Sequence, residues 1–256
     1  MIVRETQQHF IMIEQHHHGQ LSGLLANQLD DCYFDGKKLR STIEFAIEQH
    51  DCGWIAFDKE PLWNDQKESP YTFVDLPTSI KTVLYKHGID MIERKNAYAA
   101  LLCSEHYIRF MNSISDADAT KFVEDEKMRY ERIINNIKNY NNRSFLLHYA
   151  LLQLCDNISL YLCLNEPGVE EKNEHPFFKE GIPLLKNFLI ENSDILHINW
   201  KDNETILIDP FPFKKEMELE LHQKKVAKRH ISSNGLIQAY KNTPIDTINV
   251  RILAKK

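Results

Sequence analysis

Four ionisable side chains fall on or beside the apolar stripes of predicted helices, where a charged group needs a partner. His18 lies three residues before Leu21 and therefore on the same helical face. His50 continues the apolar stripe of the next predicted helix, and Asp51 follows where that helix should end. Asp156 is the only acid between residues 143 and 164, a segment that is apolar on nearly every side. Imidazole nitrogens and carboxylate oxygens in such a set are typical of divalent metal sites.

A shared cation would neutralise these groups better than any side chain nearby in the sequence. Burying an unpaired carboxylate costs several kcal/mol, even after the surrounding protein relaxes. No lysine or arginine follows Arg143 in the apolar segment that holds Asp156. Neutral imidazoles together with ionised carboxylates suit Mn, Fe, Co, Ni, Zn or Mg. We therefore predict a divalent metal site formed by His18, His50, Asp51 and Asp156.

Each of these residues also has a plain structural explanation. A single histidine on an apolar face is more often a hydrogen-bonded core residue than a ligand, and a buried aspartate can cap a neighbouring helix. The dipeptide His50-Asp51 occurs by chance in many proteins. The metal interpretation rests on four such positions falling on three separately predicted helices. A shifted helical register would instead bring His16 or His17 into the ligand set.

The elements that must position these residues are predicted to be mostly helical. An N-terminal extended stretch is followed by a helix that ends near Leu29. Apolar spacings of three and four predict further helices near residues 38–50, 78–87, 96–113, 117–139 and 143–164. From about residue 195 the apolar period changes to two, which predicts strands joined by hairpin turns.

These elements predict a mainly α fold within the α+β class. A helical metal-binding domain, with an N-terminal strand, is expected over residues 1–190. An antiparallel β appendage of about four strands is expected over residues 191–256, packed on the helical domain and able to recruit the N-terminal strand. The long irregular stretch at residues 57–77 is typical of lids and substrate walls.

The composition of the chain indicates which kinds of binding partner and which cellular compartment to expect. The formal net charge of −6 gives no general attraction to nucleic acid or to an anionic membrane. No apolar run approaches the ~20 residues that span a bilayer, and the start of the chain lacks a signal-peptide pattern. Five cysteines without metal-ligand spacing are expected to be free thiols in a reducing cytoplasm. We expect a cytoplasmic protein that binds a small molecule, binds neither nucleic acid nor membrane, and could form a homodimer.

The sequence resembles two known protein families. The order of His18, His50-Asp51 and Asp156 resembles the HD superfamily of metal-dependent phosphohydrolases, which implies an all-α core with one divalent metal held by these four residues. Segments across most of the chain also resemble a bacterial family of unknown function, the domain of unknown function 3891 family. They are MIVRE, QHHHGQLSG, HDCGW, LLCSEHY and LQLCDNISLYLC. That second resemblance supports the fold and the metal site more than any substrate.

Hydrolysis of a small phosphorylated or nucleotide-like molecule is the activity that the HD resemblance implies. A divalent cation would activate water, and Asp51 could both bind the metal and orient that water. His106 is our candidate for the general acid, because its spacing from Leu102 and Phe110 faces it inward. Glu105 points about 100° away and ranks lower. Gln15 and Trp54 are expected to line the substrate pocket, although Trp54 is equally compatible with a plain core position.

Two other functions fit the same scaffold. Some HD-like proteins hold two irons and activate oxygen, which would require His106 and a further histidine as ligands of a second metal. The scaffold could also serve as a non-catalytic binding or sensing module, which predicts no turnover of any phosphoester even with metal bound.

Overall fold

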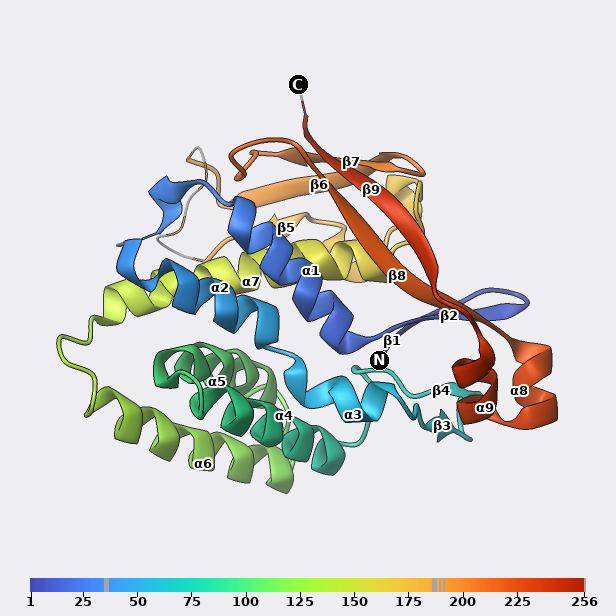
Figure 1. The fold of residues 1–256 in the computed structure, drawn as a ribbon, viewed down its shortest axis with the longest axis horizontal. Helices are drawn as coiled ribbons and strands as arrows, with labels where there is room; N and C mark the ends of the chain where they lie inside the picture. Colours follow the sequence, from blue (N-terminus) through green and yellow to red (C-terminus); the bar gives the residue numbers. More distant parts are fainter. Residues whose placement is uncertain (35–36, 186–187, 189, 191, 256) are drawn as a thin grey trace.

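The chain combines packed helices with one large mixed β-sheet (Figure 1). The computed structural model describes residues 1–34, 37–185, 188, 190 and 192–255. The α-helices are α1 Gln15–Gln28, α2 Arg40–Gln49, α3 Ile55–Asp58, α4 Thr78–Glu93, α5 Ala97–Met111, α6 Ala117–Ile134, α7 Asn142–Leu164, α8 Lys228–Asn234 and α9 Leu236–Asn242. The strands are β1 Ile2–Glu5, β2 His9–Ile13, β3 Trp63–Asn64, β4 Ser69–Pro70, β5 Ile182–Pro183, β6 Ile195–Asp202, β7 Thr205–Asp209, β8 Met217–Ala227 and β9 Asp246–Ala254.

Strands from both ends of the chain share the large sheet. Its seven strands lie in the order β1-β2-β8-β9-β7-β6-β5. The N-terminal hairpin joins through β2 and β8, where Met12 lies opposite Lys224 in antiparallel register. Strands β7 and β9 run parallel, with Thr205 opposite Arg251. The sheet is therefore mixed, and the short strands β3 and β4 form a separate hairpin.

The prediction of a mainly α fold, with an HD-like helical core and an antiparallel β appendage, is wrong. The structure is an α+β fold in which a seven-stranded mixed sheet is a principal layer. Local periodicity located the C-terminal strands, but it does not show which strands pair. Pairing between residues as distant in sequence as Met12 and Lys224 is a tertiary property, and so is the parallel pairing of β7 with β9. The predicted division at residues 190 and 191 stays a prediction, and residue 191 lies outside the described residues.

Helices α1, α2 and α7 lie between the sheet and helices α4 to α6 (Figure 1). Helix α7 contacts the sheet through Tyr161, whose hydroxyl oxygen accepts a hydrogen bond of 3.2 Å from the backbone N–H of Trp200. Its C-terminal cap, Asn165, accepts a 2.7 Å bond at its carbonyl from Arg4 on β1. The same guanidinium donates to the side-chain oxygen of Gln223 on β8 at 2.6 Å. These hydrogen bonds fix the position of α7 relative to the sheet.

Two glycines allow the backbone approaches that bring α1, α2 and α4 together. A Cβ atom at Gly23 on α1 would lie 2.6 Å from the Cβ of Glu48 on α2. A Cβ at Gly53, just after α2, would lie 2.2 Å from the carbonyl oxygen of Leu84 on α4. Separations this short do not occur between real atoms, so a larger residue would push the helices apart. The Gly23 approach sets α1 close against the end of α2, and the Gly53 approach sets the turn after α2 against α4.

Helix α7 is the longest helix, with 23 residues, and most of its side chains are buried in the core. Asn141 caps its start by accepting a 3.0 Å hydrogen bond from the backbone N–H of Ser144. Within the described part of the chain, no helix combines the length and the apolar character needed to cross a membrane. An apolar helix that stays inside a globular protein must bury its surface against neighbouring elements, and α7 does so against α1, α2, α5 and the sheet.

The burial of α7 predicts unequal effects of two leucine truncations on that helix. Leu151 is fully buried, whereas Leu146 is 40% exposed. Leu151→Ala should lower the free energy of unfolding by about 2–5 kcal/mol, because it removes buried apolar contacts and leaves a cavity. Leu146→Ala, the matched control, should cost less than about 1 kcal/mol. Urea denaturation followed by circular dichroism measures both, and equal losses would contradict the placement of α7.

Candidate metal centre

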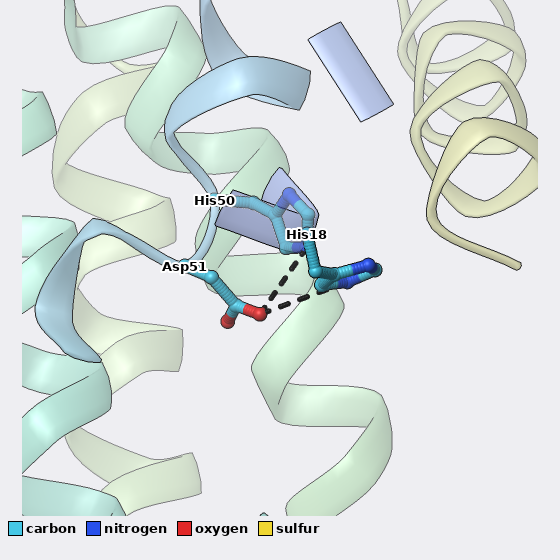
Figure 2. A group of neighbouring side chains, drawn as sticks. All are labelled: His18, His50 and Asp51. Carbon is cyan, nitrogen blue, oxygen red and sulfur yellow. Dashed lines mark ion pairs between the residues drawn. The ribbon is translucent and has the colours of Figure 1, made fainter. Parts of the chain in front are cut away.

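The four predicted metal ligands converge on one buried point. His18 comes from the first turns of α1, His50 is the residue that ends α2, and Asp51 follows it directly. Asp156 comes from the middle of α7. Figure 2 shows the carboxylate of Asp51 directed toward the rings of His18 and His50. All four residues are at most 4% exposed, which places the cluster inside the helical layer.

The ligand atoms are spaced as they would be around a single ion. His18 Nε2 lies 2.9 Å from Asp156 Oδ1 and 3.8 Å from Asp51 Oδ2. His50 Nε2 lies 3.2 Å from Asp156 Oδ1 and 3.6 Å from Asp51 Oδ2. Metal bonds of about 2.1 Å place neighbouring ligand atoms about 3.0–3.4 Å apart. Two overlapping ligand groups in this cluster could hold a metal ion. One is formed by His18, His50 and Asp51, and the other by His50, His106 and Asp156.

Both imidazoles are oriented by hydrogen bonds to their other nitrogen. His50 Nδ1 lies 2.7 Å from the carbonyl oxygen of Ile47 and donates to it, so Nε2 is the nitrogen that faces the carboxylates. His18 Nδ1 lies 2.6 Å from the hydroxyl oxygen of Ser159 on α7. His50 Nε2 makes no hydrogen bond although it is buried, because its contact with Asp156 lies outside hydrogen-bonding geometry. A buried nitrogen that faces two carboxylates without a hydrogen bond is the observation that best fits the role of a metal ligand.

The pKa values of His50 and Asp156 show that this cluster favours positive charge beside its carboxylates. Burial lowers the pKa of His50, but the charge of Asp51 and the contact with Asp156 outweigh it, and the pKa rises to about 9. Burial by itself would raise the pKa of Asp156, yet its contacts with His18 and His50 hold that pKa well below its usual range. The ion pairs recorded for Asp51 and Asp156, within the residues that the structure describes, involve only the two histidines. A divalent cation would balance the two carboxylates more fully than a proton does.

His106 on α5 completes the cluster. One of its nitrogens lies within 4.8 Å of ligand atoms from His50 and Asp156, and the rings of His50 and His106 are 5.3 Å apart. Its Nδ1 is buried without a hydrogen-bond partner. Burial lowers the pKa of His106 to about 4, so the ring is neutral at pH 7. The predicted inward direction of His106 agrees with this position.

Gln15 and Trp54, the predicted pocket residues, are both buried. Gln15 begins α1, and its side-chain oxygen has no hydrogen-bond partner. The indole N–H of Trp54 also lacks a partner, while its ring packs at 61° to the ring of Tyr85. Unpaired buried polar atoms are uncommon in proteins and need an explanation such as a bound ligand. Their pocket role stays a prediction, and the ring contacts of Trp54 also suit a core position.

The other candidate residues lie apart from the ligand atoms. His17 points toward the sheet, where its ring stacks on His222 at 4.5 Å and its Nε2 accepts a 2.9 Å hydrogen bond from the backbone N–H of His222. His16 is half-buried on α1 and belongs to neither ligand group. Glu105 forms an exposed pair with Arg109 at 2.7 Å. Of the three consecutive histidines on α1, His18 is therefore the one that faces the cluster, and its role as a ligand stays a prediction.

Three hydroxyl residues at the centre were missed by the sequence analysis. The hydroxyl oxygen of Tyr107 on α5 lies 2.5 Å from Asp51 Oδ1 and 2.8 Å from the carbonyl oxygen of His50, and its one hydrogen is donated to Asp51 in the shorter contact. Ser159 contacts His18, and Ser22 contacts Ser159 at 2.7 Å. All three stand in the segments LLCSEHY, LQLCDNISLYLC and QHHHGQLSG. Their helical spacing from the ligands was the available signal, since Ser22 follows His18 by four residues and Ser159 follows Asp156 by three.

The comparisons with known proteins identify a family without an assigned activity. The profile of the family described as "Protein of unknown function (DUF3891)" matches residues 1–228. No curated protein and no solved structure matches the chain. The matched range contains the four predicted metal ligands and His106.

The shifted pKa values predict a maximum in the pH dependence of stability for chelator-treated protein. The pKa of His106 falls from 6.5 to about 4 on folding, so stability should rise as pH increases from about 4 to 6.5. The pKa of His50 rises from 6.5 to about 9, so stability should fall as pH increases from about 6.5 to 9. Each shift corresponds to roughly 3 kcal/mol, and urea denaturation across this pH range measures the profile.

Single substitutions separate the two sides of that profile. His50→Gln should flatten the decline above pH 6.5, and His106→Gln should flatten the rise below it. His230→Gln, at an exposed position on α8, is the matched control and should leave the profile unchanged. A decline above pH 6.5 that persists in His50→Gln would show that other groups cause it.

Proposed function

We propose that this chain, which belongs to the DUF3891 family, is a metal-dependent phosphohydrolase that acts on a small phosphorylated or nucleotide-like molecule. The observation that carries the proposal is the spacing of the four ligand atoms around one buried point, with two carboxylates facing two imidazoles. His18, His50, Asp51 and Asp156 would hold the cation. A divalent cation bound there supplies a Lewis acid that makes water more acidic and polarises a phosphoryl oxygen.

Asp51 is the proposed catalytic carboxylate. Tyr107 donates to its Oδ1, which leaves Oδ2 as the atom that faces the histidines. A carboxylate fixed in this way can hold a ligand position with one oxygen and keep a constant orientation toward an attacking water. Loss of the tyrosine hydroxyl would let the carboxylate rotate, so Asp51 depends on Tyr107 for its orientation.

His106 is the proposed general acid, and its protonation would depend on the substrate. Burial keeps the ring neutral at pH 7 in the structure, with a pKa of about 4. A phosphoryl group beside the ring would bring negative charge close to it, and nearby negative charge raises the pKa of a histidine. The unpaired Nδ1 of His106 offers a point of contact for such a group. The proton would then pass from the ring to the leaving oxygen as the phosphorus–oxygen bond breaks.

The direction of substrate approach follows from the remaining exposure of the cluster. The side chains of Asp51 and Asp156 are 5% and 6% exposed, whereas those of His18 and His50 are 1% and 0% exposed. The carboxylates are therefore the slightly more exposed members of a buried centre. We propose that a small substrate enters from the side of the carboxylates, with Gln15 and Trp54 lining its path.

A second metal is the one alternative that a specific observation favours. His50, His106 and Asp156 form a second ligand group, which shares His50 and Asp156 with the four proposed ligands. A dinuclear iron centre that activates oxygen would need His106 as a ligand rather than as an acid. One metal per chain after loading with iron, and no oxygen consumption, would exclude this alternative.

The decisive measurement is metal analysis of purified protein followed by a phosphatase screen. We expect about one divalent metal per chain and turnover of a small phosphoester with Mn, Co, Ni or Mg. Asp51→Ala should abolish both metal retention and turnover, because it removes a ligand and the group that orients water. Asp118→Ala, at an exposed position in the first turn of α6, is the matched control and should change neither. Turnover that survives in Asp51→Ala, or metal retention without turnover of any phosphoester, would refute the proposal.

A further inference from the structure

Two buried hydroxyl groups connect α1 and α7 directly behind His18. Ser22 and Ser159 are both fully buried, and their hydroxyl oxygens lie 2.7 Å apart. Ser159 Oγ lies 2.6 Å from His18 Nδ1, on the side of the ring opposite the ligand atom Nε2. Ser22 Oγ also lies 3.1 Å from the carbonyl oxygen of His18, but its one hydrogen goes to the nearer Ser159 Oγ, because Ser159 donates its own hydrogen to Asp156. The two serines therefore contact both the ring and the backbone of one predicted ligand.

The hydrogen of Ser159 has a partner other than the ring. Its hydroxyl donates a 2.9 Å bond to the carbonyl oxygen of Asp156, one helical turn earlier on α7. A hydroxyl has one hydrogen and two lone pairs, so this donation leaves Ser159 as an acceptor toward His18. On its other side, His18 Nε2 lies 2.9 Å from Asp156 Oδ1, an atom that only accepts, so Nε2 carries a hydrogen there. With a cation on Nε2 in place of that hydrogen, the ring hydrogen would sit on Nδ1, where Ser159 accepts it.

We propose that Ser159, supported by Ser22, is a positioning residue that keeps the Nδ1 proton on His18 and presents Nε2 to a divalent cation. This inference rests on the proposed metal site and goes beyond it, because it assigns how one ligand is oriented. Ser159 also joins two ligands, since its hydroxyl bonds to the ring of His18 and to the backbone of Asp156. His50 reaches the same state through its own helix, by way of Ile47. Hydrogen-bond partners of this kind typically raise metal affinity by about 10–100-fold.

The first test compares Mn²⁺ affinity, measured from the free Mn²⁺ signal in electron paramagnetic resonance. Ser159→Ala should weaken Mn²⁺ binding by about 10–100-fold. Ser159→Thr keeps a hydroxyl at the same position and should restore most of the affinity. Ser22→Ala removes only the supporting contact, so its loss should be smaller than that of Ser159→Ala. Equal affinity of wild type and Ser159→Ala would overturn the inference.

The second test observes the hydrogen bond itself in ¹⁵N-histidine spectra of the Zn²⁺-loaded protein. The ring N–H protons of His18 and His50 should both exchange slowly in the wild type, because each has a buried acceptor. Ser159→Ala should lose the His18 signal by fast exchange and keep the His50 signal, which serves as an internal control. A general loss of packing would weaken both signals together, and an unchanged His18 signal would overturn the inference.

The outcomes separate this inference from the proposed function. Failure of the wild type to bind either Mn²⁺ or Zn²⁺ would overturn both. Normal binding by the wild type with unchanged binding by Ser159→Ala would overturn only the role of the serine. Should Ser159→Ala fail to fold, Ser159→Cys places a weak acceptor of similar shape at the same point and should also lower Mn²⁺ affinity. Unchanged affinity in a folded Ser159→Cys variant would then count against the inference.

Discussion

Two ionised carboxylates facing two imidazoles inside an apolar helical layer are the constraint on which the rest of the site depends. Asp156 sits among leucines on α7 and is drawn toward His18 and His50 at 2.9 and 3.2 Å. Such a group is tolerated only where positive charge balances it, because burying an unpaired carboxylate costs several kcal/mol. The contact between His50 and Asp156 contributes both to the raised pKa of His50 and to the lowered pKa of Asp156. Any metal binding at this site therefore depends on the packing that keeps the two carboxylates and the two imidazoles together.

Close packing of the helices against one another and against the sheet keeps these four side chains together. The glycines at positions 23 and 53 allow close approaches that a Cβ atom would prevent, and these bring α1 against the end of α2 and the turn after α2 against α4. Arg4 ties β1 to both the end of α7 and β8, so the helix that carries Asp156 is fixed by the sheet. These contacts fix the elements that carry the clustered side chains, and a preorganised cluster is the condition for metal binding.

Local sequence patterns predicted the helices and the cluster more completely than the architecture. Residues 143–164 were predicted as a helix and form α7 at Asn142–Leu164, because an unbroken apolar segment with a capping asparagine is a local signal. The four ligands were found because ionisable residues on apolar faces are conspicuous. The mixed sheet was missed because the partner of β2 lies on β8, far away in sequence, and periodicity does not identify partners. Tyr107, Ser22 and Ser159 were missed for the same reason, since their hydrogen-bond partners are set by tertiary packing.

The two histidines show how local and distant constraints combine in one site. His50 is oriented by the carbonyl of Ile47 in its own helix, so its geometry forms as soon as α2 forms. His18 is oriented by Ser159 on another helix, so its geometry forms only when α1 and α7 pack together. The carboxylates divide in the same way, with Asp51 adjacent to His50 and Asp156 contributed by α7. One half of the site is thus built into a single turn of chain, and the other half depends on the assembled core. A cation held between them would bind the folded chain and not the unfolded one, so it would stabilise the packing that positions its own ligands.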